Sequence, residues 1–574
     1  MFGSKLLQRK ALVLACLAPT AVFAQQAVTV GADPVDPSFA APVGESGNNN
    51  VFITQHGLEN GEFDFETIRQ QGIQLFSTPF NTYDGFGDGP VNHENLIEAG
   101  GRPSYVEGNP DLRFPGLRRI NGGDAQTCLE CHFIGSNAVI PARLQVAGIA
   151  GIGGTAFPNV TNIDADLNES LGDVAVITGR AINPPFLFGV GGIELAGREM
   201  TQKLHAIRDE AQNFPGEWFE LDALGVNFGK IRWVISEDQV EDAEELEEQE
   251  NLRFFHNCNP PGTSLASDAE LYSSTRFGQG APLMPTQMGE MEDGTVLTLD
   301  VSQIEGIGQD LIVRPLGRKG GAMTTRDFDC DAARFHFGIE AQEIFGFGVD
   351  HDGDGYANEI EPGQLSALEI ANTTNFKPVI EIPRNRKERR SARRGFQTFK
   401  DIGCAYCHIP ALETEGSVLT YHFPESAPGL RLFPEETKFY EVDLVEVAGF
   451  RRNRNGGIVL PSFSDLKVHY MGERLRETDQ NSGPQTDENG NVLLDPNGNP
   501  RDPNFTFITA RLWGIADTAP YMHDGRAPTL TEAILQHDGE AYEVRENFRA
   551  LSDDEKLDVL TFLRTLKTPT HNPF

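Results

Sequence analysis

Two short stretches of the chain contain the residues best suited to do chemistry. TCLECHFIG (Thr127–Gly135) and CAYCHIP (Cys404–Pro410) share the pattern Cys-x-x-Cys-His. Cysteines at this spacing serve three chemistries in proteins, namely covalent haem attachment, zinc binding and thiol–disulfide exchange. The other positions of the pattern, and the rest of the chain, decide between them.

Covalent haem attachment accounts for every position of both pentads. Each cysteine sulfur forms a thioether with a haem vinyl group, and the adjoining histidine ligates the iron. Thiol exchange does not require the histidine, and a zinc ribbon needs a second cysteine pair close in sequence. The sequence therefore predicts two covalently bound c-type haems. Their predicted binding residues are Cys128, Cys131 and His132 in the first pentad, and Cys404, Cys407 and His408 in the second.

Residues 1–24 have the pattern of a signal peptide. Lys5, Arg9 and Lys10 precede an apolar run that ends at the small residue Ala24. We therefore expect cleavage after residue 24 and a periplasmic or secreted location. No later stretch approaches the roughly 18 uninterrupted apolar residues of a membrane span, so we expect no integral membrane segment in the mature chain.

Export also restricts what the cysteines can do. An oxidising compartment disfavours zinc–thiolate sites and oxidises pairs of free thiols. Of the 7 cysteines, one lies in the leader and four lie in the pentads. The remaining two, Cys258 and Cys330, are candidates for a disulfide, although the sequence cannot show that they pair.

Charge and length limit the partners and the architecture. The formal net charge of −37 at pH 7 repels nucleic acid and attracts basic proteins, so we expect a basic electron-donor protein and no nucleic-acid partner. A chain of 574 residues exceeds what one core usually supports, which predicts two or three domains. Its 60 glycines and 35 prolines predict long irregular loops.

A weak internal repeat indicates how the pentads are positioned. ARRGFQTFKDIGCAYCH places Gly395 and Phe399 in a helix before the second pentad, and RQQGIQLF places Gly72 and Phe76 in a helix upstream of the first. This Gly-x-x-x-Phe pattern resembles the start of a cytochrome c domain, in which the glycine allows a close helix crossing and the aromatic ring packs near the haem. A closing helix is predicted over residues 551–566, where Ser552 and Glu555 form a capping box.

The segment DHDGDGYANEIE, residues 350–361, matches the calcium-binding loop of an EF-hand. It has carboxylates at the first, third and fifth positions, a glycine at the tight turn and a glutamate at the twelfth position. Because the loop lies between the two pentads, we expect bound calcium to fix the relative orientation of the haem regions. The predicted calcium ligands are Asp350, Asp352, Asp354, Tyr356, Asn358 and Glu361.

Six longer motifs give the chain a resemblance to a known family. They are PPFLFGVGGIE (184–194), RPLGRKGG (314–321), FHFGIEAQEIFG (335–346), IGCAYCHIPALET (402–414), SDLKVHYMG (464–472) and LWGIADTAPYMHDGRAPTLTEAILQHDGEA (512–541). In this order they resemble the di-haem oxidoreductase family of putative peroxidases, also called thiol oxidoreductases, which is related to bacterial di-haem cytochrome c peroxidases. The resemblance extends from about Phe63 to Leu566 and is weak between His205 and Ile304, which looks like an insertion.

The resemblance implies a mainly α fold with two cytochrome c-like haem domains, long irregular loops and a small mixed insertion. The expected organisation is a signal peptide over 1–24, an N-terminal haem domain over 25–204, an inserted region over 205–313, a connecting region with the calcium loop over 314–390, and a C-terminal haem domain over 391–574.

The resemblance also implies the axial ligand of the C-terminal haem. In the related peroxidases a helix beginning TLEEA leads to a methionine ligand, and aligning Thr529–Ala533 with that helix places His537 at the methionine position. The C-terminal haem is then expected to be bis-histidine, with His408 and His537. Met522 and His523 are rival ligands, and an ordinary surface position for His537 remains an alternative.

The N-terminal haem is then the expected site of reaction. By the same resemblance, His336 falls near the distal acid/base glutamate of the peroxidases, where it could act as acid/base, ligate the iron or pack in the core. The implied function is an oxidoreductase that takes electrons through the C-terminal haem and reduces a small-molecule oxidant such as hydrogen peroxide at the N-terminal haem. Alternatives are a non-enzymatic electron carrier with two six-coordinate haems, and an oxygenase on the same scaffold.

Overall fold

The fold is seen in a computed structural model that describes the following residues of the chain. These are residues 53–77, 189–235, 288–290, 295–333, 360–374, 379–423, 437–477 and 504–568, with separate positions at 127, 128, 132, 183, 187, 337, 339, 341, 492, 494, 498–500 and 502.

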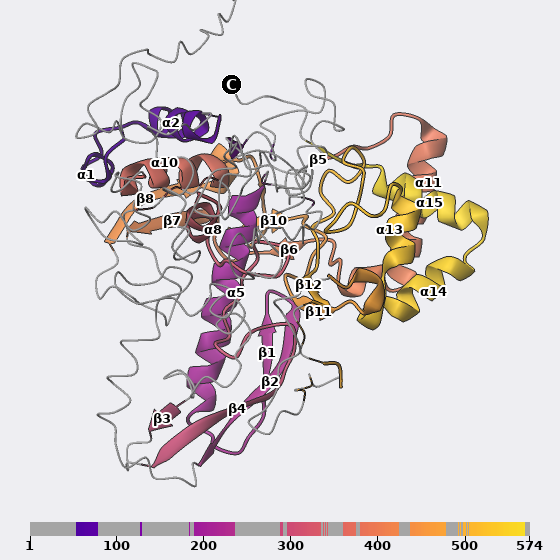
Figure 1. The fold of residues 1–574 in the computed structure, drawn as a ribbon, viewed down its shortest axis with the longest axis horizontal. Helices are drawn as coiled ribbons and strands as arrows, with labels where there is room; N and C mark the ends of the chain where they lie inside the picture. The colour runs from indigo at the N-terminus through magenta and orange to yellow at the C-terminus, as the bar shows by residue number, and fades with distance from the viewer. Residues whose placement is uncertain are drawn as a thin grey trace, which may run out of the picture. The chain divides into compact units, whose positions relative to one another are not determined.

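Groups of helices and groups of strands follow one another along the described parts of the chain (Figure 1). The helices are α1 (Gln55–Glu59), α2 (Phe65–Ser77), α5 (Val190–Ala211), α8 (Thr325–Ala332), α10 (Pro362–Thr373), α11 (Arg386–Asp401), η6 (Cys404–Tyr406), α12 (Leu444–Val447), η7 (Glu473–Leu475), α13 (Leu530–Gln536), η8 (Gly539–Ala541), α14 (Tyr542–Ala550) and α15 (Asp553–Leu563). The strands are β1 (Phe219–Ala223), β2 (Val226–Ile235), β3 (Met288–Glu290), β4 (Val296–Ile304), β5 (Val379–Ile380), β6 (Leu412–Glu413), β7 (Val418–Phe423), β8 (Thr437–Asp443), β9 (Arg451–Arg452), β10 (Ile458–Leu460), β11 (Val468–Tyr470), β12 (Thr506–Ile508) and β13 (Leu566–Lys567).

Helices α11 and α15 cross at a glycine in the C-terminal part of the chain. A Cβ atom added to Gly395 would lie 1.9 Å from the carbonyl oxygen of Asp558, so only glycine permits this approach. The Asp558 carboxylate accepts hydrogen bonds from Ser391 at 2.5 Å and from Nε of Arg394 at 2.6 Å, which joins the two helices on one side of the crossing. The predicted close crossing at Gly395 is confirmed.

Helices α2 and α10 repeat this crossing in the N-terminal part. A Cβ atom added to Gly72 would lie 1.9 Å from the carbonyl oxygen of Ala367. Four residues after each glycine, Phe76 and Phe399 are buried, with 5% and 3% of their surface exposed. The internal repeat read from the sequence therefore corresponds to two similar helix pairs, although α10 follows α2 only after nearly 300 residues of chain.

A buried ion pair supports the N-terminal helix pair. Arg326 of α8 is 1% exposed and lies against α10. Its Nη1 atom donates to Ser366 at 2.8 Å and to Glu369 at 3.3 Å, and its Nη2 atom donates to the carbonyl oxygen of Pro362 at 3.2 Å. These bonds satisfy a guanidinium that would otherwise be costly to bury.

The long helix α5 packs against an antiparallel sheet with the strand order β1-β2-β4-β3. Strand β2 buries Phe228 before an irregularity in its pairing with β4, and Ile231 and Trp233 after it. The indole Nε1 of Trp233 donates to the carbonyl oxygen of Arg208 in α5 at 2.9 Å. Figure 1 shows β1 and β2 running beside the second half of this helix.

Two small hydrophobic clusters each include a pentad cysteine. Cys128 packs against the first cluster and Cys404 packs against the second. The first cluster consists of Leu75, Phe76, Cys330, Ala333, Phe337, Ile339, Ala341, Ile360, Leu365 and Leu368, and the second of Phe399, Ile402, Phe463, Ile515, Phe548, Val559, Phe562, Leu563 and Leu566. Each pentad therefore lies beside apolar residues of its own helix pair.

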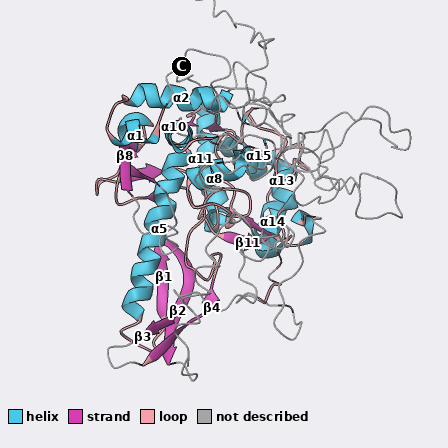
Figure 2. Cartoon of the chain, turned by 60° about the vertical axis from the view of Figure 1, so that its left-hand side comes forward, coloured by secondary structure: helices cyan, strands magenta, loops and turns pink. Residues whose placement is uncertain are grey.

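The prediction of a mainly α fold is wrong. Among the described residues 41% are helical and 21% lie in strands, and the strands form several small antiparallel sheets (Figure 2). Strands β1 to β4 come from the region expected to be an insertion, and β7–β8, β6–β10–β9 and β11–β12 come from the segments between α11 and α13. Antiparallel pairing satisfies the backbone of these segments, which connect helices across long stretches of sequence.

None of the described helices is both long and apolar enough to cross a membrane. Residues 1–24, which carry the signal-peptide prediction, lie outside the described residues, so export and periplasmic location stay predictions. The four boundaries between the five expected segments also stay predictions.

Candidate functional site

The C-terminal pentad begins where α11 ends. The helix is capped at its start by Asn385, whose side chain accepts a hydrogen bond from the backbone N–H of Lys387. Gly403 then takes a left-handed conformation with φ 102°, which turns the chain into the short helix η6. This turn leaves Cys404 half-buried and Tyr406 81% exposed.

His408 lies opposite His537 in the space beside the second hydrophobic cluster. The centroids of the two imidazole rings are 6.2 Å apart, with an interplanar angle of 63°. Nδ1 of His408 lies 2.9 Å from the carbonyl oxygen of Phe463, and Nδ1 of His537 lies 2.9 Å from the carbonyl oxygen of Ala533. Because a carbonyl oxygen can only accept, both Nδ1 atoms donate, which leaves both Nε2 lone pairs available.

This arrangement fits a metal ion held between two imidazoles. Two metal–nitrogen bonds of about 2 Å each, together with the inner half of each ring, span a centroid separation close to 6.2 Å. A histidine ligand usually donates its other ring N–H to a carbonyl or carboxylate, as both histidines do here. Burial, and next the neighbouring His537, lower the pKa of His408 to about 4, and burial lowers the pKa of His537. Both rings are therefore neutral, the form that binds metals.

Aromatic rings surround the His408 side of the site. Phe399 lies 6.4 Å from the His408 ring, 6.3 Å from Phe463 and 5.4 Å from Phe562, measured between ring centroids. The last two contacts are edge-to-face, a favourable geometry for aromatic pairs. An apolar wall of this kind suits a flat macrocycle and keeps water from its iron.

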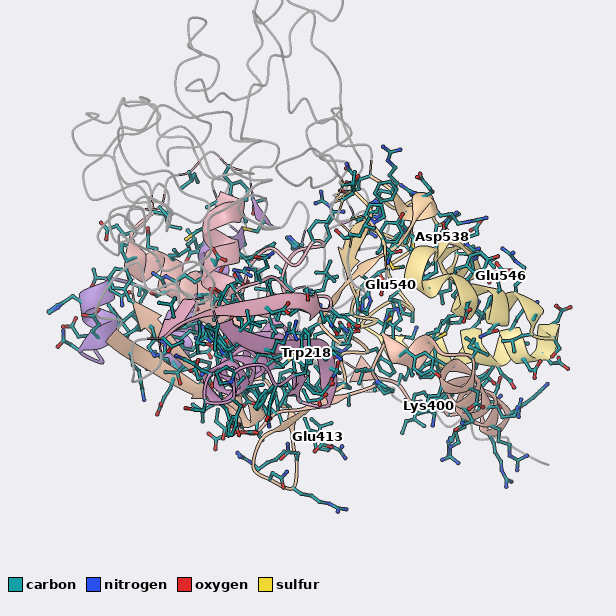
Figure 3. The ribbon with its side chains drawn as sticks, turned by 90° about the horizontal axis from the view of Figure 1, so that it is seen from below. Trp218, Lys400, Glu413, Asp538, Glu540 and Glu546 are labelled. Carbon is teal, nitrogen blue, oxygen red and sulfur yellow. The ribbon has the colours of Figure 1, made fainter. Side chains whose placement is uncertain are left out.

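The loop that carries His537 is held from its C-terminal side. His537 follows directly after α13, which is capped by the Thr529 side chain. The guanidinium of Arg545 in α14 donates to the carbonyl oxygen of His537 at 2.8 Å and to the Asp538 carboxylate at 3.0 Å. In Figure 3, Asp538 and Glu540 are labelled on this loop and Glu546 on the helix that follows.

A cluster of charged side chains lies beside Cys407. His469 of β11 places Nε2 2.9 Å from Asp465 and Nδ1 2.7 Å from Glu540, and the donor atoms of Cys407, Asp465 and His469 lie within 4.8 Å of one another. Burial alone would lower the pKa of His469, but its hydrogen bonds to Asp465, Cys407 and Glu540 raise that pKa well above the usual value. Both ring nitrogens donate to carboxylates, so His469 is an imidazolium without a lone pair for a metal.

Sequence reasoning did not identify this cluster. The motif SDLKVHYMG contains Asp465 and His469 at a spacing of four, which was a visible signal for a paired site. Glu540 lies 71 residues after His469, and no local pattern connects the two.

The rival ligands in the motif YMHDG have other contacts. The ring of His523 stacks on Phe507 with centroids 4.4 Å apart, and burial lowers the His523 pKa to about 4. Asn183 fixes the backbone of this loop, since its Nδ2 atom donates to the carbonyl oxygens of Pro520 at 3.1 Å and Met522 at 2.9 Å. The structure thus brings His537 opposite His408 and places His523 against β12; the role of His537 as a ligand stays a prediction.

The N-terminal pentad is described at Cys128 and His132, and Thr127 directly before it is also described. The backbone N–H of His132 donates to the carbonyl oxygen of Cys128 at 2.8 Å, as that of His408 does to Cys404 at 3.0 Å. The His132 ring lies 6.4 Å from Phe76, and the Thr127 hydroxyl donates to the Phe76 carbonyl oxygen at 3.1 Å.

Other predicted site residues lie outside the described part of the chain. These are Cys131, His336, Cys258, and the calcium-loop residues Asp350, Asp352, Asp354, Tyr356 and Asn358. The last predicted calcium ligand, Glu361, is described at the N-cap of α10. Cys330 is buried in α8, and its pairing with Cys258 stays a prediction.

Comparison with known proteins places one part of the chain in a family. No curated protein matches. Among solved structures, hydrazine synthase of Kuenenia stuttgartiensis, pressurised with 20 bar xenon, is 18% identical over 58% of this chain and 99% of that chain, with a TM-score of 0.24. Residues 454–566 match the family described as di-haem oxidoreductase, putative peroxidase. That range contains Phe463, Asp465, His469, His537 and Glu540. Residues 454–566, which supply most of the surroundings of His408, therefore resemble the di-haem oxidoreductase (putative peroxidase) family named from the sequence motifs.

Proposed function

We propose that the chain is an exported di-haem c-type oxidoreductase that reduces peroxide. Membership of a di-haem oxidoreductase family supports the general class. The observation that carries the proposal is the pair His408 and His537, whose ring centroids lie 6.2 Å apart and whose Nδ1 atoms both donate to backbone carbonyl oxygens. Neutral imidazoles in this orientation are ready to ligate one iron from both sides.

The residues present fit two haems. Cys404, Cys407 and His408 would hold one, with His537 as its second axial ligand. Cys128, Cys131 and His132 would hold the other. When bound, each haem supplies an iron centre that gains or loses one electron. The apolar clusters beside Cys128 and Cys404 would cover the macrocycles and limit the access of water.

The two sites take different roles in the proposed reaction. His537 closes the C-terminal site, which suits it to passing electrons. The N-terminal site is the proposed place of reduction, where one hydrogen peroxide, two electrons and two protons give two waters. His336 is the candidate to carry a proton to the departing oxygen. The electrons come from an external protein, and the net charge of −37 favours a basic donor. We also propose calcium at residues 350–361, immediately before α10.

Haem counting and electron paramagnetic resonance test this proposal. The pyridine haemochrome assay should return about two haems per chain, resistant to acid-acetone because thioethers hold them. The resting protein should show one low-spin signal that remains on half-reduction, and a second, high-spin or switching signal from the His132 site. His537→Gly should convert the persistent low-spin signal alone, whereas His56→Gly, which changes an exposed histidine in α1, should change neither signal.

Several outcomes would contradict the proposal. A preparation from a haem-competent host that carried zinc and no haem would end the haem assignment. Two low-spin signals in every redox state, with no reaction toward peroxide or cyanide, would favour an electron carrier instead of a peroxidase. A C-terminal signal that His537→Gly left unchanged would remove His537 as the ligand.

A further inference from the structure

Three charged side chains connect β11 to the loop after His537. Asp465 and His469 are buried, with 2% and 8% of their surface exposed. His469 donates to both Asp465 and Glu540, at 2.9 and 2.7 Å. The second carboxylate oxygen of Glu540 accepts from the backbone N–H of Tyr470 at 2.8 Å. Glu540 therefore accepts hydrogen bonds from the His469 side chain and from the Tyr470 backbone, both in β11.

The backbone around Glu540 also lies tight against β11. A Cβ atom added to Gly539, which has φ 57°, would lie 2.2 Å from the carbonyl oxygen of Tyr470. Gly472 approaches the backbone nitrogen of Gly539 in the same way, since its added Cβ atom would lie 2.7 Å from that nitrogen. The segment 538–540, which follows His537 directly, thus has one defined position relative to β11.

The cluster is a pair of carboxylates around one cation. Asp465 is held in place because it also accepts from the backbone N–H of Lys467 at 3.0 Å. Hydrogen bonds in which both partners are charged are stronger and more directional than neutral ones, and in a buried site they fix geometry. Cys407 lies beside this cluster, and its sulfur is within 4.8 Å of the ligand atoms of Asp465 and His469.

We propose that Asp465, His469 and Glu540 form a positioning clamp that holds His537 opposite His408 and so keeps the C-terminal haem closed to external ligands. The clamp connects the loop to β11. Arg545 of α14 holds the same loop through its bonds to the His537 carbonyl oxygen and the Asp538 carboxylate. With the clamp intact, the segment that follows His537 is bonded on both sides, which would restrict movement of His537 away from the site. This inference rests on the proposed function, because it assumes a haem between the two histidines.

Two single substitutions test the clamp in the full-length holoprotein. His469→Gln removes the cation and one of its two hydrogen bonds. Glu540→Gln keeps the side-chain shape and the bond from Tyr470 but removes the negative charge. The control is Glu473→Gln, which changes an exposed carboxylate on the neighbouring η7, whose ion pair with Arg476 is 4.0 Å long. His537→Gly serves as the reference for a fully lost ligand.

Loosening of His537 should appear in the spectrum of the C-terminal haem. Losing one charge-assisted hydrogen bond typically shifts a bound–unbound equilibrium by about 10- to 100-fold. His469→Gln and Glu540→Gln should therefore keep about two haems per chain. The C-terminal haem, whose low-spin signal is the one that His537→Gly converts, should gain a high-spin fraction. It should also bind cyanide about 10-fold or more tightly than in wild type. Added imidazole should restore the low-spin signal, which a general loss of structure would not allow.

The outcomes separate the clamp from the proposed function. Wild type without haem, or without the persistent low-spin signal, would overturn both. Normal wild-type signals with His469→Gln and Glu540→Gln indistinguishable from Glu473→Gln would overturn the clamp alone. Loss of haem from both clamp variants would also overturn it, because a role in overall folding would then account for the cluster.

Discussion

The N-terminal and C-terminal pentads lie beside similar helix pairs, but they differ on the side that the pentad histidine faces. Each follows a helix that crosses a second helix at a glycine, and each histidine ring lies 6.4 Å from a phenylalanine of that first helix, Phe76 or Phe399. Among the described residues, only the C-terminal pentad has a second histidine facing the first. That histidine comes from a segment over a hundred residues away.

The difference shows that the two sides of each site are built by different means. The pentad side depends on a Gly-x-x-x-Phe helix that lies upstream of each pentad, so it can be repeated within one chain. The opposite side depends on a distant loop with its own anchors, Arg545 on one flank and Glu540 on the other. A change in that loop can replace His537, the proposed axial ligand, without disturbing the helix pair. In the proposed function, haem attachment and reactivity at the iron would therefore depend on separate parts of the sequence.

The largest effect should come from filling a helix crossing. Gly72→Val and Gly395→Val would each force a side chain into a backbone carbonyl that lies 1.9 Å from the added Cβ. We expect a loss of more than about 5 kcal/mol in the free energy of unfolding, at the extreme end for single substitutions. Chemical denaturation and the haem count would measure it. Gly416→Val is the control, because the nearest atom to its added Cβ is a flexible carboxylate oxygen at 3.4 Å. Near-normal stability of Gly72→Val would mean that the two crossings are not equivalent.

A smaller effect should distinguish the ion pairs of the two helix pairs. Arg326→Met would remove a cation from a buried pair whose side chains are 2% and 0% exposed, at a cost of about 3–5 kcal/mol in unfolding free energy. Arg394→Met removes the partner of Asp558 in the C-terminal pair, but the Arg394 side chain is 63% exposed, so solvent screens that interaction and the loss should be far smaller. Denaturation of both variants tests the contrast, and equal losses would contradict it.

Calcium removal should have a smaller effect than the loss of Arg326, and the effect should be confined to one region. The proposed loop ends at Glu361, the N-cap of α10, so a chelator should lower hydrogen-exchange protection in α10 and α2 and leave α11 and α15 unchanged. At calcium concentrations about 100 times the dissociation constant, bound calcium should raise the free energy of unfolding by about 2.7 kcal/mol. Asp352→Ala with Glu361→Ala should abolish the sensitivity to chelator. Equal loss of protection in α11 and α15 would contradict this assignment.

Local patterns in the sequence predicted the helix features that depend on residues close together in the chain. The glycine crossings at Gly72 and Gly395 follow from Gly-x-x-x-Phe, and α15 begins with the predicted capping box of Ser552 and Glu555. Each depends on residues within one turn or one helix face, which a sequence displays directly.

The parts that were missed depend on pairing across long distances. The β1–β2–β4–β3 sheet joins residues 219–235 to residues 288–304, inside the region expected to be a small mixed insertion, but its strand pairing was not predicted. The clamp joins β11 to Glu540, and no spacing rule relates the two. The family resemblance supplied His537 but not the residues that hold it in place.

The exposure of Tyr406 has a consequence for the speed of electron entry. This side chain lies between the two cysteines of the C-terminal pentad and is 81% exposed. Cys404 and Cys407 on either side of it are half-buried, so the thioether edge of a haem attached there would lie close to the surface. Tunnelling rates fall steeply with distance, so a docked donor could deliver its electron at this edge in a single step, without intermediate carriers inside the protein.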